Sequence, residues 1–523
     1  MKAFLMFAGR DFDPGQVLAR RENERRHNRN RTAIATELPL PWQQQALCQD
    51  LGLSIIVDAM SSDDPFLHDA AQVGVLSSLA DIDPIRYRQE ILADCLDNPE
   101  IVRAIYRVAI EAIEGERSNY WSAFGRYPTG ILHHAVEVMH LFAGKLRSLR
   151  SIAEQYSSRF RSAGMSRFLA MLECELEETY LVEMEEHLSR LKFRRGILIS
   201  ARLGRGNKAR DFVLRKLPDD TRSWILRHLF DERSEGYTFR LHPRDEAGAR
   251  ALAALSDRGV DLAANAVAQS ADHLLGFFQM LRTELAFYVG CLNLRERLAE
   301  LDEPICLPAP LPLGARMLSA AGLYDPSLAL SMGQKVVGND FQAERNDLVI
   351  ITGANTGGKS TFLRSVGAAQ LMMQAGMFVP AAKFSAELCA GVYTHYRREE
   401  DATMESGKWD EELERMSEIV DRITPDSMLL LNESFASTNE REGSEIASQI
   451  VSALLDRRIK VLFVTHLYHF ARSQFTQPVA SASFLRAERR PDGTRPFRLV
   501  SGEPLQTSYG EDLYRAIFSG SDS

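Results

Sequence analysis

The chain has 523 residues, 45% hydrophobic and 25% charged, which excludes fibrous and disordered proteins and indicates about two to four globular domains. The formal net charge of −9 excludes a protein that coats nucleic acid by bulk charge, so a polyanion would require a local basic patch. The six cysteines form no Cys-x-x-Cys pair, which argues against a zinc site or a disulfide framework and fits a reducing cytosol.

The first residues, MKAFLMFAGRDF, form an apolar run that is too short and too soon followed by charge for a signal peptide. No later stretch reaches the length of a membrane span. We therefore expect a cytoplasmic protein with no membrane partner. The basic run at 20–31 lies in a polar segment and is interpreted as a flexible arm or a surface.

Helical periodicity with few Pro or Gly dominates residues 81–301. Apolar side chains recur at spacings of three and four in 168–193 and again in 274–292, which predicts two long amphipathic helices. Their simplest role is core packing in a helical bundle. The alternative is that they act as levers that carry motion from a nucleotide site.

A basic stretch at 192–216 carries nine Lys or Arg residues and one acidic residue, Asp211. Short apolar runs flank a glycine-rich turn, which predicts two strands of a hairpin. Four basic residues lie in or beside the turn: Arg202, Arg205, Lys208 and Arg210. Such a hairpin could grip a phosphate backbone, and the alternative is a solvated face with no partner.

Four prolines between positions 304 and 312 mark a boundary after the last long helix. Beyond it, the segment ITGANTGGKSTF (351–362) matches the phosphate-binding-loop template. The match rests on Gly353, Gly358, Lys359 and Ser360. A buried strand is predicted just before the loop (347–352) and a helix just after it (360–376), the order that such a loop requires.

Two further strands are predicted to end in polar residues. The apolar run at 427–434 ends in Asn432 and Glu433, and the run at 460–466 ends in His466. An acidic strand end in a phosphate-loop enzyme holds the water shell of the metal and activates the attacking water. A polar group on a neighbouring strand is suited to sense the γ-phosphate. The three strand ends together predict one nucleotide site.

These motifs jointly resemble the MutS family of DNA mismatch repair ATPases. The resemblance covers the chain from about residue 325 to its end and is carried by TGANTGGKSTFLR (352–364), MFVPA (377–381), LLLNES (429–434) with Thr438, Glu442 and Gly443, FVTH (463–466) and TSYGEDLYRAIF (507–518). The stretch IDPIRYRQEILADCLDNPEI (82–101) is similar to the opening of the helical core of that family.

The resemblance implies an α+β multi-domain fold, with a helical core and lever bundle that carries a small β clamp-like insert, followed by an ABC-type P-loop α/β ATPase domain. The expected divisions are a short N-terminal segment (1–80), the helical core and lever domain (81–310) with its basic insert near 192–245, and the ATPase domain (311–523). The resemblance also implies DNA as a partner, a homodimer formed through the ATPase domains, and a clamp at the basic hairpin.

The resemblance implies ATP and Mg²⁺ as cofactors. The nucleotide would be held by Gly353, Ala354, Asn355, Thr356, Gly357, Gly358, Lys359, Ser360 and Thr361. Within this set, Asn355 would contact phosphate, Lys359 the β- and γ-phosphates, and Thr361 the α-phosphate. Ser406 is the best match to a serine that completes the site of the partner subunit in this family.

The same resemblance assigns the catalytic and metal-binding groups. Glu433 would activate water, His466 would read the γ-phosphate, and Lys359 would neutralise the transferring group. Ser360 and Asn432 would hold the metal. Asn432 departs from the family, which has Asp at this position, so one negative charge is missing and weaker Mg²⁺ binding is expected.

A second departure concerns mismatch recognition. The family reads mismatches with an N-terminal domain carrying a Phe-x-Glu wedge, and residues 1–80 are too few for that domain and its connector. The Phe-x-Glu sequence at Phe230–Glu232 is discounted because it lies far from the N-terminus. We therefore expect any DNA to be gripped through backbone charge or shape.

Three functions are considered for a sequence with these motifs. The first is a homodimeric MutS-like ATPase that binds duplex, branched or otherwise structured DNA, with ATP controlling its grip. The second is a nucleotide-switched protein-interaction module with weak or no ATPase activity. The third, a chromosome-organising ATPase with a long coiled-coil arm, is disfavoured because there is no LSGGQ-like signature and no helix longer than roughly 40 residues is predicted.

Overall fold

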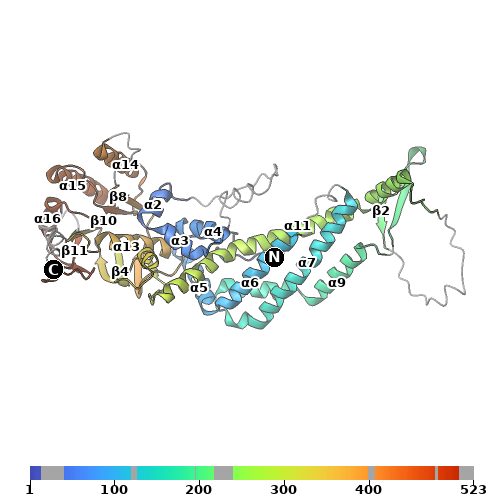
Figure 1. Ribbon diagram of the computed structural model, residues 1–523, viewed down its shortest axis with the longest axis horizontal. Helices are drawn as coiled ribbons and strands as arrows, with labels where there is room; N and C mark the ends of the chain where they lie inside the picture. Colours follow the sequence, from blue (N-terminus) through green and yellow to red (C-terminus); the bar gives the residue numbers. More distant parts are fainter. Residues whose placement is uncertain are drawn as a thin grey trace, which may run out of the picture. The chain divides into compact units, whose positions relative to one another are not determined.

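The computed structural model describes residues 1–12, 40–118, 127–194, 196–216, 239–398, 407–477 and 481–505 (Figure 1). The chain divides into two compact units, one of residues 1–3, 103–159 and 166–282 and one of residues 4–102, 160–165 and 283–523. The first unit is mainly helical, and the second combines helices with two sheets. The fold is therefore mixed α and β, as expected.

The first unit packs helices around an apolar core. Its helices are part of α6 (Pro99–Ser118), α7 (Pro128–Tyr156), α8 (Ala163–Glu175), α9 (Glu178–Leu191) and part of α11 (Glu246–Glu300). Phe142 of α7 and Phe278 of α11 are fully buried, with ring centroids 5.3 Å apart. This burial of apolar helix faces confirms the expected core packing.

The prediction of one continuous helix at 168–193 is wrong, because α8 ends at Glu175 and α9 begins at Glu178. At the break, the carbonyl oxygen of Leu176 accepts a hydrogen bond from Arg150 Nη1 at 2.9 Å. The Leu176 side chain is buried. Tertiary contacts thus satisfy groups that a continuous helix would have paired within itself.

The prediction that no helix exceeds roughly 40 residues is also wrong. Helix α11 has 55 residues, and apolar spacing identified only its stretch at 274–292. Residues 246–273 are rich in Ala, the best helix former, and poor in large apolar side chains. Helix propensity extends α11 where apolar periodicity gives no signal.

The predicted hairpin is present in the first unit. Strands β1 (Leu198–Leu203) and β2 (Ala209–Arg215) pair in antiparallel fashion, with Arg202 directly opposite Arg210. The turn between them contains Gly206 at φ 71°, a left-handed conformation that costs glycine no steric strain.

In the second unit, the apolar start of the chain is part of the core. The carboxylate of Glu284 accepts hydrogen bonds from the backbone N–H groups of Leu5, Met6 and Phe12 at 2.6 to 2.9 Å. The fully buried Arg88 donates from Nε to the carbonyl oxygen of Met6 at 3.0 Å. The helices that follow are α2 (Gln44–Asp50), α3 (Leu53–Ser61), α4 (Pro65–Leu76) and α5 (Ile82–Asp97).

The main sheet of the second unit has six strands in the order β12-β11-β6-β10-β9-β8. They are β6 (Leu348–Gly353), β8 (Val392–Tyr396), β9 (Met428–Asn432), β10 (Lys460–Val464), β11 (Ala482–Ala487) and β12 (Leu499–Ser501). All are parallel except β12 at one edge. The strands predicted at 347–352, 427–434 and 460–466 correspond to β6, β9 and β10. Because these three are parallel, their carboxyl ends lie at the same edge of the sheet.

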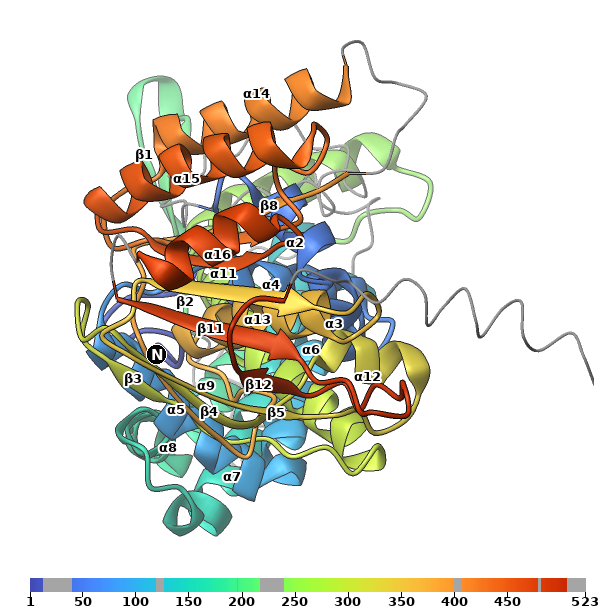
Figure 2. The same ribbon diagram turned by 90° about the vertical axis from the view of Figure 1, so that its left-hand side faces the viewer.

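Helices cover both faces of this sheet (Figure 2). Helices α14 (Lys408–Arg422), α15 (Glu440–Asp456) and α16 (Tyr468–Thr476) share one apolar core with β6, β9 and β10. Helix α13 (Lys359–Gln374) packs on the other face, where Gly367 lies so close to Leu430 that an added Cβ would stand 2.5 Å from its Cδ1. Burial on both faces explains why the strands are apolar throughout.

A second sheet has four strands in the order β3-β7-β4-β5. They are β3 (Ala309–Leu311), β4 (Met317–Leu323), β5 (Asn339–Glu344) and β7 (Lys383–Glu387), and α12 (Pro326–Met332) lies between β4 and β5 in the sequence. All six cysteines are free in this structure. Among the described helices, none has both the length and the apolarity that a membrane crossing requires.

Candidate functional site

The glycine-rich loop joins β6 to α13 in a compact turn. Gly353 (φ 108°) and Gly358 (φ 89°) have left-handed backbone conformations, which favour glycine. A Cβ on Gly357 would lie 2.6 Å from Ala487 Cβ, so only glycine fits there. Thr356 also has positive φ (54°), which is uncommon for a residue with a side chain. The loop conformation therefore requires glycine at these three positions. The loop also leads into the N-terminus of α13, and the N-terminus of a helix favours anions.

Lys359 folds back over this loop. Its Nζ donates to the carbonyl oxygens of Gly353 (3.0 Å) and Ala354 (2.9 Å). The side chain is almost fully buried, and this burial lowers the pKa of Lys359 to about 8, although the nearby Glu433 opposes the shift. An ammonium group that has lost much of its hydration is suited to bind phosphate oxygens.

The sequence places Ser360 and Asn432 far apart, and the fold brings them together. Ser360 Oγ donates to the amide oxygen Oδ1 of Asn432 at 2.8 Å. Ser360 is in the first turn of α13, and Asn432 ends β9. Two oxygens at this separation could serve as ligands or water acceptors for a hard divalent cation. Within the described parts of the chain, no cluster of three or more His, Cys, Asp or Glu residues is arranged to hold a metal ion.

Glu433 and His466 form a carboxylate–imidazole pair in the site. Glu433 Oε1 lies 3.3 Å from His466 Nε2, and the backbone of Glu433 has a positive φ of 54°. Its backbone N–H donates to the Val464 carbonyl oxygen at 2.8 Å, which ties this bend to β10. The hydrogen bond from His466, together with the charges of Lys359 and Arg397, lowers the pKa of Glu433. The carboxylate is therefore ionised and available as a proton acceptor.

Buried polar groups hold the segment after Glu433. His395 Nε2 lies 3.0 Å from the carbonyl oxygen of Glu412, to which it donates, and Nδ1 lies 2.7 Å from Ser434 Oγ. The Glu412 carboxylate accepts the backbone N–H of Phe435 at 2.5 Å. These contacts fix the bend that carries Glu433 against the sheet.

His395 leads to a prediction about stability. Burial lowers the pKa of His395 to about 4, below its ordinary value of 6.5, so the unfolded chain binds a proton that the folded chain does not. The free energy of unfolding should therefore fall by about 3 kcal/mol through this residue as the pH drops from 6.5 to 4. Urea denaturation at stepped pH measures this fall. The His395→Gln variant should show a shallower pH slope, and equal slopes would contradict the assignment.

Sequence reasoning missed two arginines at this edge of the sheet. Arg495 Nη1 donates to the Asn355 carbonyl oxygen at 2.5 Å and to Thr356 Oγ1, across 140 positions of sequence. Arg397 Nη1 lies 3.9 Å from Glu433 Oε2. Neither arginine belongs to a recognisable motif, and only the tertiary fold brings them to the loop.

Two cavities adjoin the loop. One of about 410 Å³ has apolar walls from Met332, Val336, Val337 and Phe497, and also contacts Gly358. Such a space suits the flat apolar face of a nucleotide base. The other, of about 290 Å³, is lined by Ser360, Thr361, Asn432, Asp50, Arg364, Arg397 and Arg398. The second cavity is rich in cationic groups and opens beside the candidate metal ligands.

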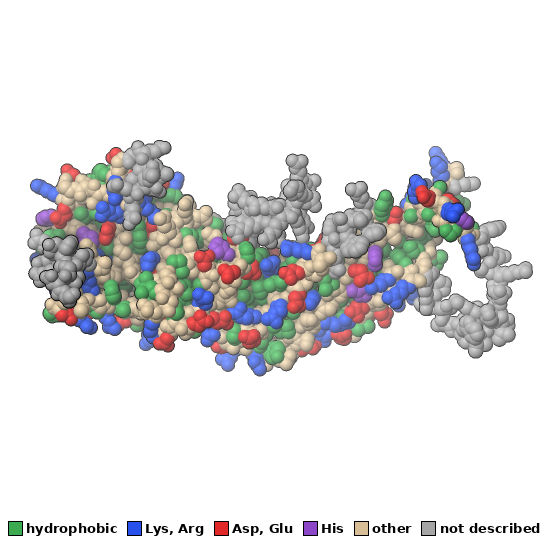
Figure 3. Space-filling model, in the orientation of Figure 1, with side chains coloured by type: hydrophobic (Ala, Val, Ile, Leu, Met, Phe, Trp, Pro, Cys, Tyr) green, Lys and Arg blue, Asp and Glu red, His purple; other side chains and the backbone are tan. Residues whose placement is uncertain are grey.

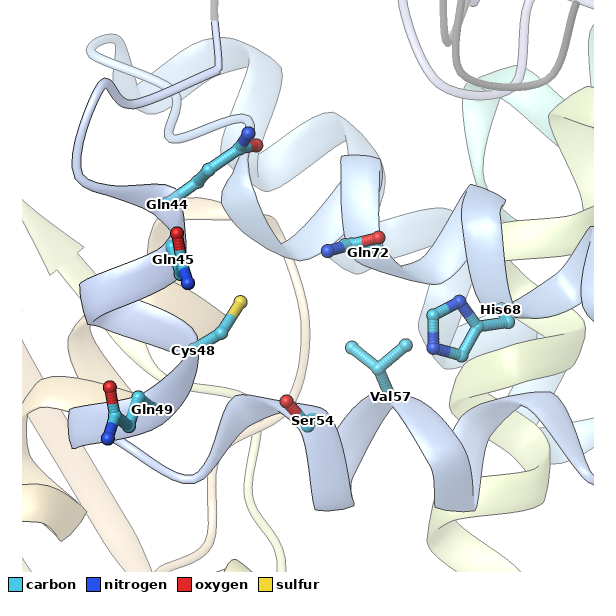
Figure 4. A pocket seen from close by; sticks show the side chains of 8 residues that line it. All are labelled: Gln44, Gln45, Cys48, Gln49, Ser54, Val57, His68 and Gln72. Carbon is cyan, nitrogen blue, oxygen red and sulfur yellow. The ribbon is translucent and has the colours of Figure 1, made fainter. Parts of the chain in front are cut away.

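A larger cavity of about 530 Å³ lies among α2, α3 and α4 (Figure 4). Four glutamines, Cys48 and His68 are among the side chains that line it. The ring of His68 lies 3.6 Å from the carboxylate of Asp58 and 3.5 Å from that of Asp69. None of the predicted site residues lines this cavity, so the strand ends remain the candidate site.

The hairpin of the first unit is strongly basic and solvent-exposed. Figure 3 shows Lys and Arg side chains, in blue, over this hairpin. All four predicted contact residues are exposed: Arg202, Arg205, Lys208 and Arg210. Arg202 lies opposite Arg210 in the strand register, and like charges in this position destabilise a hairpin; the exposed carboxylate of Asp211 lies 3.8 Å from Arg210 Nε and offsets part of this repulsion.

Some predicted features lie outside the described residues. They are Ser406, the Phe-x-Glu sequence at 230–232, the basic run at 20–31 and the segment 507–518. The roles assigned to them stay predictions.

Comparison with known families identifies two matching regions. The family described as the MutS2 N-terminal domain matches residues 80–301, and the family described as MutS domain V matches residues 349–518. The first region contains the basic hairpin and the second contains the glycine-rich loop with the ends of β9 and β10.

Several characterised proteins resemble the chain. The DNA mismatch repair protein MutS of Thermus aquaticus is 32% identical over 177 residues, which is 34% of this chain and 22% of that protein. Endonuclease MutS2 of Carboxydothermus hydrogenoformans is 31% identical over 177 residues, covering 33% and 22%. MutS protein homolog 4 of Mus musculus is 31% identical over 137 residues, covering 26% and 14%. The chain thus spans only about a fifth of the length of the two bacterial relatives.

Proposed function

Because the chain belongs to the MutS family, we propose that it binds and hydrolyses ATP where β6, β9 and β10 end, and that ATP controls its grip on DNA. The observation that carries this proposal is the convergence of Lys359, the Ser360–Asn432 pair and the Glu433–His466 pair at one edge of the sheet. A nucleotide loop, oxygen ligands and an ionised carboxylate are the parts that phosphoryl transfer to water requires.

ATP would occupy the loop and the apolar cavity beside it. The loop residues Gly353 to Gly358 would offer backbone N–H groups to the phosphates, with Asn355 and Thr361 as side-chain contacts. The base would enter the cavity between Val336 and Phe497, which borders Gly358. Lys359, which is bound to two loop carbonyls, would turn its ammonium group to the β- and γ-phosphates.

The residues present fit a magnesium ion. Ser360 would give a hydroxyl ligand and Asn432 would accept a hydrogen bond from metal-bound water, both through oxygen, which Mg²⁺ prefers. When bound, Mg²⁺ would neutralise phosphate charge. Glu433 would take a proton from the attacking water, and His466 would orient this carboxylate and sense the γ-phosphate.

Asn432 leads to a prediction about metal dependence. An amide oxygen accepts a hydrogen bond but carries no charge, so we expect slow hydrolysis that needs a high Mg²⁺ concentration. Asn432→Asp should lower the Mg²⁺ concentration for half-maximal hydrolysis by roughly tenfold, about 1.4 kcal/mol. Titration of Mg²⁺ against the hydrolysis rate measures this. No wild-type turnover at any Mg²⁺ concentration would favour a nucleotide switch, and superimposable curves would contradict the charge argument.

DNA would be gripped by the basic hairpin. Arg202 lies opposite Arg210 across the strands, and Arg210 Nε lies 3.8 Å from the exposed carboxylate of Asp211, so a phosphate group would compete with only one weak partner for these guanidinium groups. The relatives named as a mismatch repair protein and an endonuclease support DNA as the polyanion. The protein would act as a homodimer through its ATPase domains, with Ser406 reaching the partner site.

A charge-reversal variant tests the hairpin. With Arg202, Arg205, Lys208 and Arg210 changed to Glu, DNA binding should weaken alike for all sequences, and the log–log salt slope should flatten by about one unit per lost contact. Fluorescence anisotropy over a salt series measures both. As a control, Arg202→Glu with Arg210→Glu is compared with reversal of the exposed Lys383 and Arg457 of the second unit. If both pairs changed the DNA affinity and the salt slope equally, the hairpin would be a solvated surface with no specific role in DNA binding.

The alternative function is a nucleotide-switched module whose helices bind a protein. A panel of homoduplex, mismatched, forked and four-way DNA at several salt concentrations separates the two. Salt-sensitive binding to any of these DNAs, altered by nucleotide, supports the proposed function. Nucleotide binding without DNA binding supports the alternative.

A further inference from the structure

The cavity of about 290 Å³ beside the loop contains three arginines. Two of them have carboxylate partners: Arg398 Nη1 lies 2.8 Å from Asp50 Oδ1, and Arg364 Nε donates to Asp325 Oδ2 at 2.5 Å. Both aspartates are buried, so their carboxylates hold these guanidinium groups in place.

Arg397 differs from its two neighbours. Its guanidinium lies 3.9 Å from Glu433 Oε2, which is beyond hydrogen-bond distance, and its side chain is 40% exposed. Its backbone is fixed, because the Arg397 N–H donates to the Asn432 carbonyl oxygen at 3.0 Å. The residue is thus tied to the strand that carries Asn432 and Glu433, while its charged end faces the cavity that Ser360 and Thr361 also line.

The charges of this edge are unusual for a magnesium site. The strand end offers a neutral amide at Asn432, and the adjacent strand end offers a guanidinium at Arg397. The protein therefore provides a positive charge, at Arg397, next to the position where the negative charge that would attract a metal ion is missing, at Asn432. A guanidinium presents several N–H donors in a planar fork that matches phosphate oxygens.

We propose that Arg397 is a further catalytic residue, whose guanidinium binds the γ-phosphate of ATP and supplies part of the positive charge otherwise left to Mg²⁺. This inference rests on the proposed function. Arg397 forms only hydrogen bonds in the reaction. The water oxygen bonds to the γ-phosphorus, the bond to the bridging oxygen breaks, that oxygen leaves with ADP, and Glu433 takes the water proton.

The arrangement gives Arg397 a second effect. Glu433 lies between His466 at 3.3 Å and Arg397 at 3.9 Å, so cationic or hydrogen-bonding groups stand on two sides of the carboxylate. An arginine that bridges Glu433 and the γ-phosphate would offset the repulsion between these two anions.

Binding constants for ADP and for the non-hydrolysable triphosphate adenylyl imidodiphosphate test this, measured by calorimetry in Mg²⁺ and in EDTA. Arg397→Ala should weaken triphosphate binding at least about tenfold and leave ADP binding within about twofold, because only the γ-phosphate contact is lost. The loss should be larger in EDTA, where no metal shares the charge. Arg397→Lys should restore part of the triphosphate preference.

Arg457→Ala is the control, because it removes the same charge from an exposed position after α15, at the opposite end of the parallel sheet. An unchanged ratio of triphosphate to ADP affinity in Arg397→Ala would overturn the inference, whether both affinities stay at the wild-type value or both fall by the same factor. Wild-type protein that binds neither nucleotide would overturn the proposed function itself, together with this inference.

Discussion

Replacing Glu433 with Gln is expected to lower the rate of ATP hydrolysis at least about a hundredfold and to leave ATP binding intact. Glutamine keeps the shape of the side chain and can still contact His466, which lies 3.3 Å from the carboxylate. It cannot take a proton from water. Since Glu433 lines neither of the two cavities beside the loop, the contacts that hold nucleotide should remain.

Steady-state phosphate release and calorimetric ATP binding measure the two parts of this prediction. Glu445→Gln is a matched control, because it makes the same change at an exposed position of α15. Hydrolysis in that variant should equal the wild-type rate. Loss of ATP binding together with turnover in Glu433→Gln would show that this carboxylate has been given the wrong role.

Replacing Lys359 with Ala should instead remove both binding and hydrolysis. Its Nζ is the ammonium group that bridges the carbonyl oxygens of Gly353 and Ala354 across the loop, and no other lysine is placed there among the described residues. Two or more charge-assisted contacts to phosphate would be lost, each of about 1.5 to 3 kcal/mol, so nucleotide affinity should fall at least about a hundredfold.

Lys383→Ala serves as the control for Lys359→Ala, because Lys383 is exposed at the start of β7 in the other sheet. Nucleotide binding is measured by calorimetry and turnover by phosphate release, with the melting temperature of each variant as a check on folding. Turnover at the wild-type rate in a folded Lys359→Ala protein would contradict the site. Lys359→Ala and Glu433→Gln together separate nucleotide binding from water activation, since only Lys359→Ala should abolish nucleotide binding.

The sequence predicted the strands of the site well, because each is a short apolar run buried on both faces and ended by a polar residue. The same holds for the hairpin at β1 and β2, where a glycine-rich turn separates two apolar runs. In these places a local pattern and the tertiary environment agree, which is the condition for prediction from sequence.

Prediction failed where tertiary contacts decide the structure, and also where apolar periodicity was the only signal used. At the helix break near Leu176, the carbonyl oxygen of Leu176 accepts a hydrogen bond from Arg150, and the local sequence contains no signal that predicts this break. Helix α11 continues through an Ala-rich stretch with little apolar periodicity, so its length follows from propensity. Arg495 reaches the loop from 140 positions away, and Arg397 faces Glu433 from the next strand.

In the proposed function, the nucleotide at the ends of β6, β9 and β10 controls the grip on DNA. The most direct measurement is the rate at which a fluorescent duplex dissociates from the Glu433→Gln protein in stopped flow, with Mg²⁺ and either ATP or ADP bound at saturation. A coupling of this kind predicts rates that differ about fivefold or more between the two nucleotides. Equal dissociation rates, with both nucleotides shown to be bound, would contradict the claim.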